Sequence, residues 1–223
     1  MGWSEFIAAF ALFFLSHALP VRPPLRPRLE AVLGARGFTL AYSALSLAVL
    51  AWLILAAGRA PYVQLWGWAP WQAYVPLIAM LPACLIAALA VGRPNPFSFG
   101  GARAQAFDPA RPGIVRWMRH PMLAALALWA FAHLVPNGNL AHVLLFGLFG
   151  GFALIGGRLI DRRKRNEMGA HWTRLDAARR AGPVLPRPAQ PLGAVLRLSG
   201  GVGLYWGLIA LHPHLFGVSP LPV

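Results

Sequence analysis

The stretch "RHPMLAALALWAFAH", Arg119–His133, contains twelve uncharged residues between two histidines. Extended back to about Gly113, it is long enough to form a membrane-spanning helix, which needs about 20 residues. Histidine is an unfavourable residue inside lipid, and ionisable side chains at membrane depth are candidates for function. The stretch therefore predicts a buried helix and raises the question of what its histidines bind.

The composition supports a membrane protein. Of the 223 residues, 58% are hydrophobic and 12% are charged, and the mean hydropathy is +0.58. The charged fraction is about half that of a typical soluble domain, where about 25% is usual. The apolar residues form six blocks, at residues 3–19, 38–57, 70–91, 114–135, 139–156 and 192–215. We predict one all-α domain over residues 1–223, a polytopic bundle of about six transmembrane helices, with the first block retained and not cleaved as a signal peptide.

The net charge of +14 is concentrated in alternate loops. The loops after the first, third and fifth blocks are rich in arginine, whereas the loop after the second holds only Arg59 and the loop after the fourth holds no basic residue. Because basic loops stay in the cytoplasm, both termini are expected on the opposite, outer side of the membrane. Membrane lipids with anionic headgroups account for the basic loops, so we expect no nucleic-acid partner.

The cysteine and acidic residues limit which kinds of metal site the chain can form. Cys84 is the single cysteine, which excludes an intrachain disulfide and a cysteine-ligated metal cluster. No acidic residue lies near the centre of a block, so a carboxylate-rich di-iron centre is not expected. Four acidic residues are predicted to lie in loops, namely Asp108, Asp161, Glu167 and Asp176.

The segment Arg158–Arg180 has a different pattern. Leu159, Met168, Trp172 and Leu175 recur at roughly helical spacing among basic residues. This predicts a helix that leaves the membrane and then lies along the cytoplasmic surface. A solvated charged helix and a clamp for a cofactor or headgroup are the alternatives.

The depths of the histidines limit which of them can share a metal. His120 and His133 are thirteen residues apart, so about 20 Å along one helix, and cannot bind one ion together. His17, about 9 Å above the cytoplasmic face, and His142, near the start of the fifth block, are both possible partners. Neutral imidazoles in an apolar bundle suit haem, with Arg116 and Arg119 available for propionates. We interpret His171, His212 and His214 as interfacial polar anchors.

Several motifs resemble the NnrU family. They are "GIVRWMRHPMLAALALWAFAHLVPNGNLAHVLLFGLFGGFALIG" at Gly113–Gly156, "FFLSHALP" around His17, "NPFSFGG" at Asn95–Gly101 and the "LHPHLFGVSP" ending. Together they span nearly the whole chain. The resemblance implies an integral protein of the bacterial inner membrane, so the outer side, where both termini are expected, is the periplasm. It also implies a link to denitrification and nitric oxide metabolism, with nitric oxide or nitrite respiratory components as partners.

The NnrU family is related to the zeta-carotene isomerases, which are membrane haem b enzymes, and this relation implies a ligand pair. His17 in "SHA" and His133 in "WAFAH" match the two haem-ligating histidines, with Arg116, Arg119 and His120 as further cofactor-binding candidates. A haem bound by both histidines would span about 10 Å of depth, so it needs tilted helices, an inclined porphyrin or a shifted first helix. The isomerases have a cysteine where this chain has Ala130, so a haem-dependent, isomerase-like activity is one expectation and not a consequence of the fold.

Two other classes of function remain open from the sequence. The RHP motif followed by a basic segment with Glu167 is also similar to membrane methyltransferases that use S-adenosylmethionine, although the usual Tyr-x-Gly after RHP is absent. The third possibility is a non-catalytic assembly or transport factor.

Overall fold

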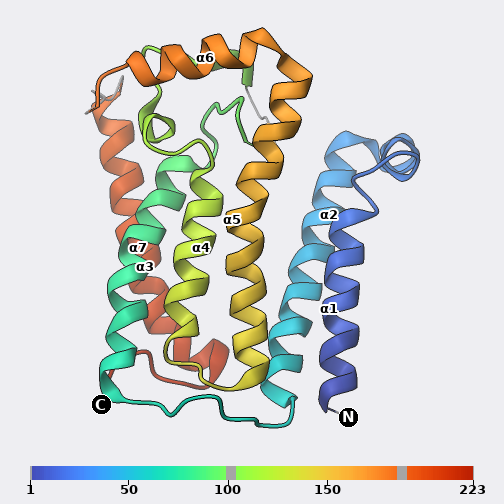
Figure 1. Ribbon diagram of the computed structural model, residues 1–223, viewed down its shortest axis with the longest axis vertical. Coiled ribbons are helices and arrows are strands. Elements are labelled where there is room, and N and C mark those ends of the chain that lie inside the picture. The colour runs from blue at the N-terminus through green and yellow to red at the C-terminus, as the bar shows by residue number, and fades with distance from the viewer. Residues whose placement is uncertain (1, 99–103, 185–189, 223) are drawn as a thin grey trace. The chain divides into compact units, whose positions relative to one another are not determined.

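The computed structural model describes residues 2–98, 104–184 and 190–222. The last residues of the "NPFSFGG" motif and the basic residues Arg103 and Arg187 lie outside these ranges. The described residues form seven α-helices and no strand, which confirms the all-α prediction (Figure 1). The helices are α1 (Gly2–Ala18), α2 (Leu25–Arg59), α3 (Pro70–Ala90), α4 (Pro121–Leu134), α5 (Leu140–Met168), α6 (Ala170–Ala181) and α7 (Pro191–Phe216).

Each of the six predicted blocks forms a helix. Four of these helices, α2, α3, α5 and α7, are long and apolar enough to cross a membrane. The other two, α1 and α4, are apolar but have only 17 and 14 residues. The chain thus has the helices of a membrane protein, while the count of six spans and the periplasmic termini stay predictions.

The residues group into two compact units. The first unit comprises Met1–Gly67 and Gly138–Leu145, and the second comprises Trp68–Asn137 and Phe146–Val223. His17 therefore belongs to the first unit, whereas Arg116, Arg119, His120 and His133 belong to the second.

In the first unit, α1 and α2 pack against each other through small and aromatic side chains. Phe6 and Ala9 of α1 and Leu53 and Ala56 of α2 are each almost fully buried. At the N-terminal end of α1, the Glu5 carboxylate accepts hydrogen bonds from Trp52 Nε1 at 3.3 Å and Arg59 Nη1 at 3.1 Å. This polar contact joins the start of α1 to the end of α2.

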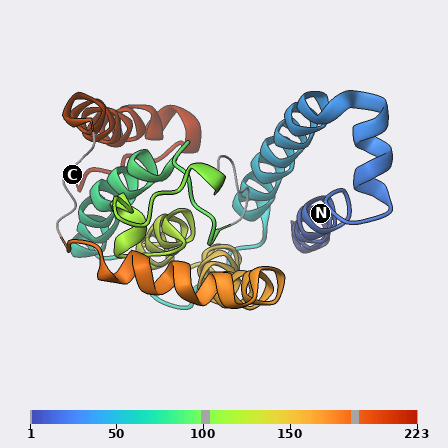
Figure 2. The same ribbon diagram turned by 90° about the horizontal axis from the view of Figure 1, so that it is seen from above.

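Helix α2 extends beyond its predicted block, 38–57, because a second helical stretch precedes it. Gly34 has φ 70° and ψ 163°, which is not helical, and the chain bends there (Figure 2). Residues with this backbone conformation are essentially always glycine, because a Cβ would clash. Gly34 thus separates the arginine-containing residues 25–33 from the apolar helix that follows.

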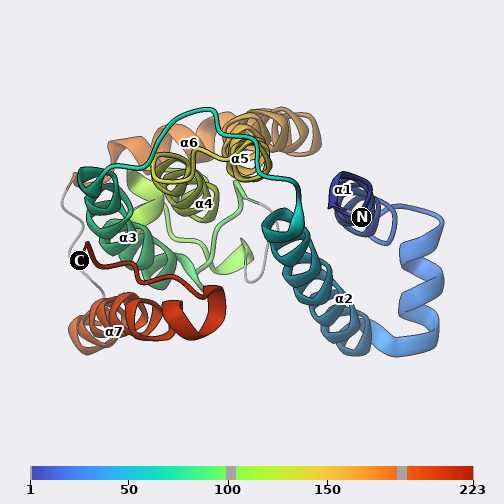
Figure 3. The ribbon, with the colours of Figure 1, turned by 90° about the horizontal axis from the view of Figure 1, so that it is seen from below.

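In the second unit, α3 packs on both α4 and α7, and the three helices lie side by side when viewed from below (Figure 3). Gly201 of α7 allows a close approach, because a Cβ there would lie 3.1 Å from the Leu85 Cα of α3. Arg197 of α7 donates hydrogen bonds to the carbonyls of Ala88 at 2.9 Å and Val91 at 2.6 Å, which satisfies the C-terminal end of α3. The backbone of α3 is continuous through Pro76 and Pro82.

Helices α4 and α5 approach each other through the glycines of α5. A Cβ on Gly150 would lie 2.7 Å from the Phe131 ring of α4, and a Cβ on Gly157 would lie 3.2 Å from His120 Cδ2. Small residues at helix contacts are typical of membrane bundles, where they let backbones come close. The glycines of α5 thus make room for a ring at each end of α4.

The predicted start of the fourth helix, near residue 114, is wrong. Residues Gly113–Arg116 form a short 3₁₀ helix, η2, and α4 begins only at Pro121. Proline disfavours the helical conformation in the preceding residue, and His120 accordingly has φ −121° and ψ 66°. The RHP motif therefore lies in a loop that leads into α4, and α4 is only about 21 Å long.

Helix α5 continues past its predicted end at Gly156 to Met168, so Asp161 lies on a helix and not in a loop. Gly169, with φ 54°, then turns the chain into α6, which runs across one end of the second unit (Figure 1, Figure 2). Asp176 lies on α6, so its predicted loop position is also wrong. The structure thus shows a long helix followed by a turn and a second helix, and the location of α6 along the cytoplasmic membrane surface stays a prediction.

Candidate functional site

His17 lies in the last turn of α1. Its Nδ1 is 2.7 Å from the Phe13 carbonyl oxygen, one helical turn earlier. The Phe13 ring packs on the imidazole at a centroid distance of 4.1 Å, and Tyr42 of α2 contacts it edge-on at 6.0 Å. The position of α1 matches the predicted block to within one residue.

His133 lies in the last turn of α4 and has the same local arrangement. Its Nδ1 is 2.8 Å from the Trp129 carbonyl oxygen, again one turn earlier. The rings of Trp129 and Phe146 flank the imidazole at centroid distances of 5.6 and 5.5 Å. The Asn137 side chain donates to the His133 backbone carbonyl at 2.7 Å, which holds the end of the helix in place.

These hydrogen bonds determine which imidazole nitrogen can bind a metal. A backbone carbonyl only accepts, so the proton must be on Nδ1 in both His17 and His133. The Nε2 atom of each neutral ring then keeps its lone pair, and metal-binding histidines commonly have the other ring N–H donated in this way. Within residues 2–98, 104–184 and 190–222, no group of three or more His, Cys, Asp or Glu side chains could hold an ion. The two neutral imidazoles are donors of the kind that haem iron takes.

His212, interpreted from the sequence as an interfacial anchor, has the same feature. Its Nδ1 is 2.8 Å from the Val218 carbonyl oxygen, and its ring contacts Phe216. It lies on α7, in the same unit as His133. The "LHPHLFGVSP" ending is the only indication of this residue in the sequence.

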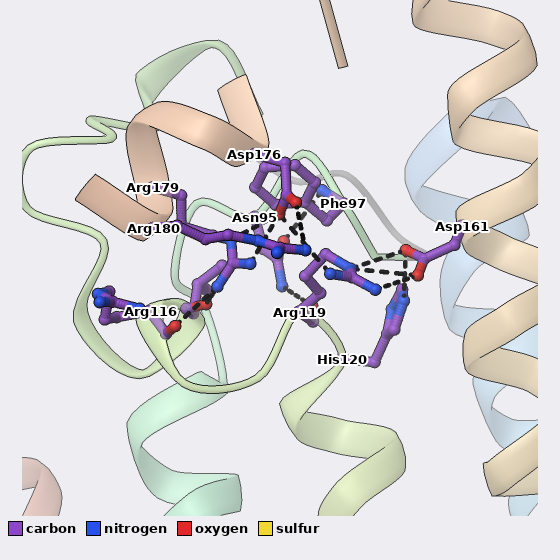
Figure 4. Close-up of polar contacts among 10 residues, drawn as sticks. Asn95, Phe97, Arg116, Arg119, His120, Asp161, Asp176, Arg179 and Arg180 are labelled. Atoms are coloured by element: carbon purple, nitrogen blue, oxygen red, sulfur yellow. Dashed lines mark hydrogen bonds and ion pairs between the residues drawn. The ribbon is translucent and has the colours of Figure 1, made fainter. Parts of the chain in front are cut away.

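The RHP loop forms a polar cluster at the α6 end of the second unit (Figure 4). Arg119 Nε lies 3.0 Å from Asp161 Oδ1, and Arg119 Nη2 contacts Oδ2 of the same carboxylate. His120 Nε2 lies 3.0 Å from Asp161 Oδ1, and its Nδ1 lies 3.4 Å from Ser98 Oγ. The hydrogen bond and charge of Asp161 raise the pKa of the Arg119 guanidinium, which stays protonated.

Asp176 and Arg179 of α6 extend this polar cluster. Arg179 Nη2 donates to Asp176 Oδ1 at 2.7 Å, and Arg180 Nη2 lies 2.9 Å from Oδ2 (Figure 4). Arg179 Nη1 donates to the carbonyls of Val115 and Arg116 at 2.8 and 2.7 Å. Side chains of Asp176 and Arg179 are only 7% and 5% exposed, so their charges are compensated inside the protein and not by water.

The polar cluster is also joined to the loop after α3. The Asn95 side chain donates to the Arg119 carbonyl at 2.8 Å and accepts from the Phe97 backbone N–H at 3.0 Å. Phe97 and Trp172 form a buried apolar cluster with Ile114 and Val115 beneath α6. Arg179 lies over the Phe97 ring at 5.7 Å and Arg165 lies over the Trp172 ring at 4.3 Å, so cation–π contacts join the polar residues to this apolar cluster.

The structure separates the predicted propionate partners from His133. Arg116 donates from Nε to the Gly182 carbonyl at 2.9 Å, while Arg119 and His120 bind Asp161. Arg119 precedes the first residue of α4 and His133 is near its last, so they are about 20 Å apart along the helix. Arg119 is thus remote from His133 along the helix axis, and the cofactor-binding role of Arg116, Arg119 and His120 stays a prediction.

Asp161 and Asp176 are the residues that the sequence analysis missed. They are two of only six acidic residues in the chain, and both lie in its most basic segment. That scarcity was a usable signal, because an acidic residue among so many arginines is well placed for an ion pair. Glu167, the residue on which the methyltransferase alternative depends, is instead exposed and pairs with Lys164 and Arg163.

A groove of about 330 Å³ lies beside the polar cluster. Arg119, His120 and Arg179 line its polar end, and Ala124, Ala127 and Ala153 are among the residues of its apolar wall. All of these residues belong to the second unit. The groove has both the charges and the apolar surface that an amphiphilic ligand requires.

The comparison with known proteins agrees with the motifs. A family model described as NnrU protein matches residues 5–220, which is nearly the whole chain. No curated protein and no solved structure matches it. The match covers both units and both candidate histidines, so the chain belongs to the NnrU family.

Proposed function

We propose that this NnrU-family protein binds haem b in the bacterial inner membrane, with His17 and His133 as the iron ligands, and serves nitrogen-oxide respiration. The observation that carries the proposal is that the two imidazoles have the same tautomer and the same hydrogen-bond partner, a backbone carbonyl. Each donates its Nδ1 proton to a backbone carbonyl one turn earlier and presents Nε2 as a base. Flanking aromatic rings keep each imidazole in an apolar setting that suits a porphyrin.

In this proposal the residues of the chain hold and orient the cofactor. When bound, the cofactor would supply electron transfer or Lewis acidity at its iron. Phe13 and Trp129 fix the tautomers of His17 and His133 through their carbonyls. The partners of the protein are then components of nitric oxide or nitrite respiration. A redox-dependent isomerisation, as in the related isomerases, is the alternative use of the same haem.

The absorption spectrum of the purified protein tests the proposal. Protein from haem-replete cells should show a Soret band that is lost in His17→Ala and His133→Ala and retained in His142→Ala. A colourless, folded preparation contradicts haem binding. Retention of the band in His17→Ala with loss in His212→Ala would assign the second ligand to α7 instead.

The role in respiration needs a separate test, because a haem does not define a reaction. Cells that lack the protein should reduce nitric oxide more slowly, and the wild-type protein should restore the rate. A His133→Ala variant that restores it fully would show that the haem is not needed for this role.

A further inference from the structure

The groove beside the polar cluster has a shape that suits a chain-like ligand. Ala124 and Ala127 share one face of α4, three residues apart, and His120 lies immediately before the helix at the same side of the groove. Ala153 and Gly157 line the opposite side from α5. From His120 to Ala127 the wall runs about 10 Å along the helix axis. Its volume of about 330 Å³ lies at the lower end of the range for ligand-binding sites.

The polar end of the groove carries excess positive charge. Residues 158–180 of α5 and α6 contain eight basic and three acidic residues. Within the polar cluster, Asp161 and Asp176 face Arg119, Arg179 and Arg180, so the arginines outnumber the carboxylates. Arg119 Nη1 makes only a long contact of 3.7 Å with Asp176. A nearby anion would therefore be attracted to this end.

Trp117 lines the groove near the same end and indicates the level of the membrane surface. Its side chain is exposed, yet its indole N–H donates to the Val184 carbonyl at 2.8 Å. Tryptophan prefers the headgroup level of a bilayer, where one edge is apolar and the other polar. The alanines then lie below this level, in hydrocarbon, where water does not fill an open groove.

We propose that the groove holds one acyl chain of an anionic phospholipid, with the lipid phosphate at the Arg119 end and the chain against Ala124, Ala127 and Gly157. The apolar wall favours binding of an acyl chain, and the excess of arginine favours a negatively charged headgroup. A free phosphate would use the arginines but leave the apolar wall empty. This inference does not depend on the haem.

Lipid retention tests the proposal. The full-length protein is exposed to vesicles of phosphatidylglycerol and phosphatidylcholine in equal amounts, purified in detergent, and examined by native mass spectrometry. The wild type should retain phosphatidylglycerol with a several-fold preference. Ala127→Leu, which fills the groove, should reduce retention several-fold, whereas Ala210→Leu, the same change at an exposed position of α7, should not.

Three results would overturn the proposal. They are equal retention of the two lipids by the wild type, unchanged retention by Ala127→Leu, and displacement of the lipid by inorganic phosphate, which would leave a site for free phosphate only. Size-exclusion chromatography establishes that each variant is folded. If Ala127→Leu does not fold, Ala124→Leu gives the same comparison on the neighbouring turn.

Discussion

Arg119 and Asp161 form a bidentate ion pair that joins the RHP loop to α5. Arg119 Nε lies 3.0 Å from Oδ1 and 3.1 Å from Oδ2 of the Asp161 carboxylate. The same Oδ1 lies 3.0 Å from His120 Nε2, so one carboxylate binds two successive residues of the motif. The arginine and histidine of RHP thus fix the start of α4 against α5.

Replacement of Asp161 should destabilise this end of the second unit. The Asp161 side chain is 11% exposed, and Asp161→Asn removes the charge that balances Arg119. Removing one partner of a buried ion pair lowers the free energy of unfolding by about 3–5 kcal/mol. We expect about 3 kcal/mol here because Arg119 is partly exposed. Thermal unfolding in detergent, followed by circular dichroism, should show a midpoint lower by several degrees.

Glu167→Gln provides the control for that experiment. Glu167 lies on the same helix and also pairs with basic residues, but it is exposed. Exposed ion pairs contribute little to stability, so the unfolding midpoint should not change. Equal effects of the two substitutions would show that the polar cluster around Asp161 has no special structural role.

The glycines of α5 should differ sharply in their tolerance of alanine. Gly150→Ala places a Cβ within 2.7 Å of the Phe131 ring, so α4 and α5 must separate or the ring must move. Overpacking of this kind costs about 1–3 kcal/mol. Gly147→Ala meets no atom within 4 Å and should be neutral or slightly stabilising. Thermal unfolding of the two variants in detergent tests this order, and a reversed order would contradict the described contact between α4 and α5.

The bend in α2 should require glycine. Gly34→Ala forces a residue with a Cβ into φ 70° and ψ 163°, at a cost of about 1–3 kcal/mol. Gly58→Ala in the same helix meets open space and has no positive φ, so it should be tolerated. Limited proteolysis should cut Gly34→Ala faster than the wild type. Equal rates for Gly34→Ala and Gly58→Ala would contradict a required bend.

The predicted orientation in the membrane can be tested with thiol labelling. A Cys84→Ala background removes the single native thiol, which is buried in α3. In intact spheroplasts, Tyr62→Cys in the loop after α2 should react with a membrane-impermeant maleimide. Arg174→Cys on α6 should react only after the membrane is permeabilised. The opposite pattern would invert the predicted topology.

The sequence was sufficient for the all-α fold class because the lengths of the apolar blocks are those of helices that cross a bilayer. It failed at the start of α4, where the effect of Pro121 on His120 outweighed the apolar character of residues 114–120. It also ended the fifth helix too early. Beyond Gly156 the residues are charged, but they are still good helix formers, and α5 continues to Met168.

The candidate site was predictable only in part. His17 and His133 were identified from their motifs, but their Nδ1 hydrogen bonds depend on side-chain rotation and not on sequence pattern. The sequence suggests a propionate as the partner of Arg119 because this arginine lies at one edge of the apolar bundle, and nothing in the sequence pattern indicates that Asp161 is near it. Its actual partner is forty-two residues away, and a contact of that separation has no signature in a single sequence.

The most direct test of haem ligation replaces each imidazole with a free one. His133→Gly and His17→Gly should each lose the low-spin Soret spectrum when purified, and millimolar imidazole should restore it in both, because the free base takes the place of the missing Nε2. Gly substitution of His142 should leave the spectrum unchanged without imidazole. A wild-type protein without a Soret band, or variants whose spectra neither change nor respond to imidazole, would contradict iron ligation by His17 and His133.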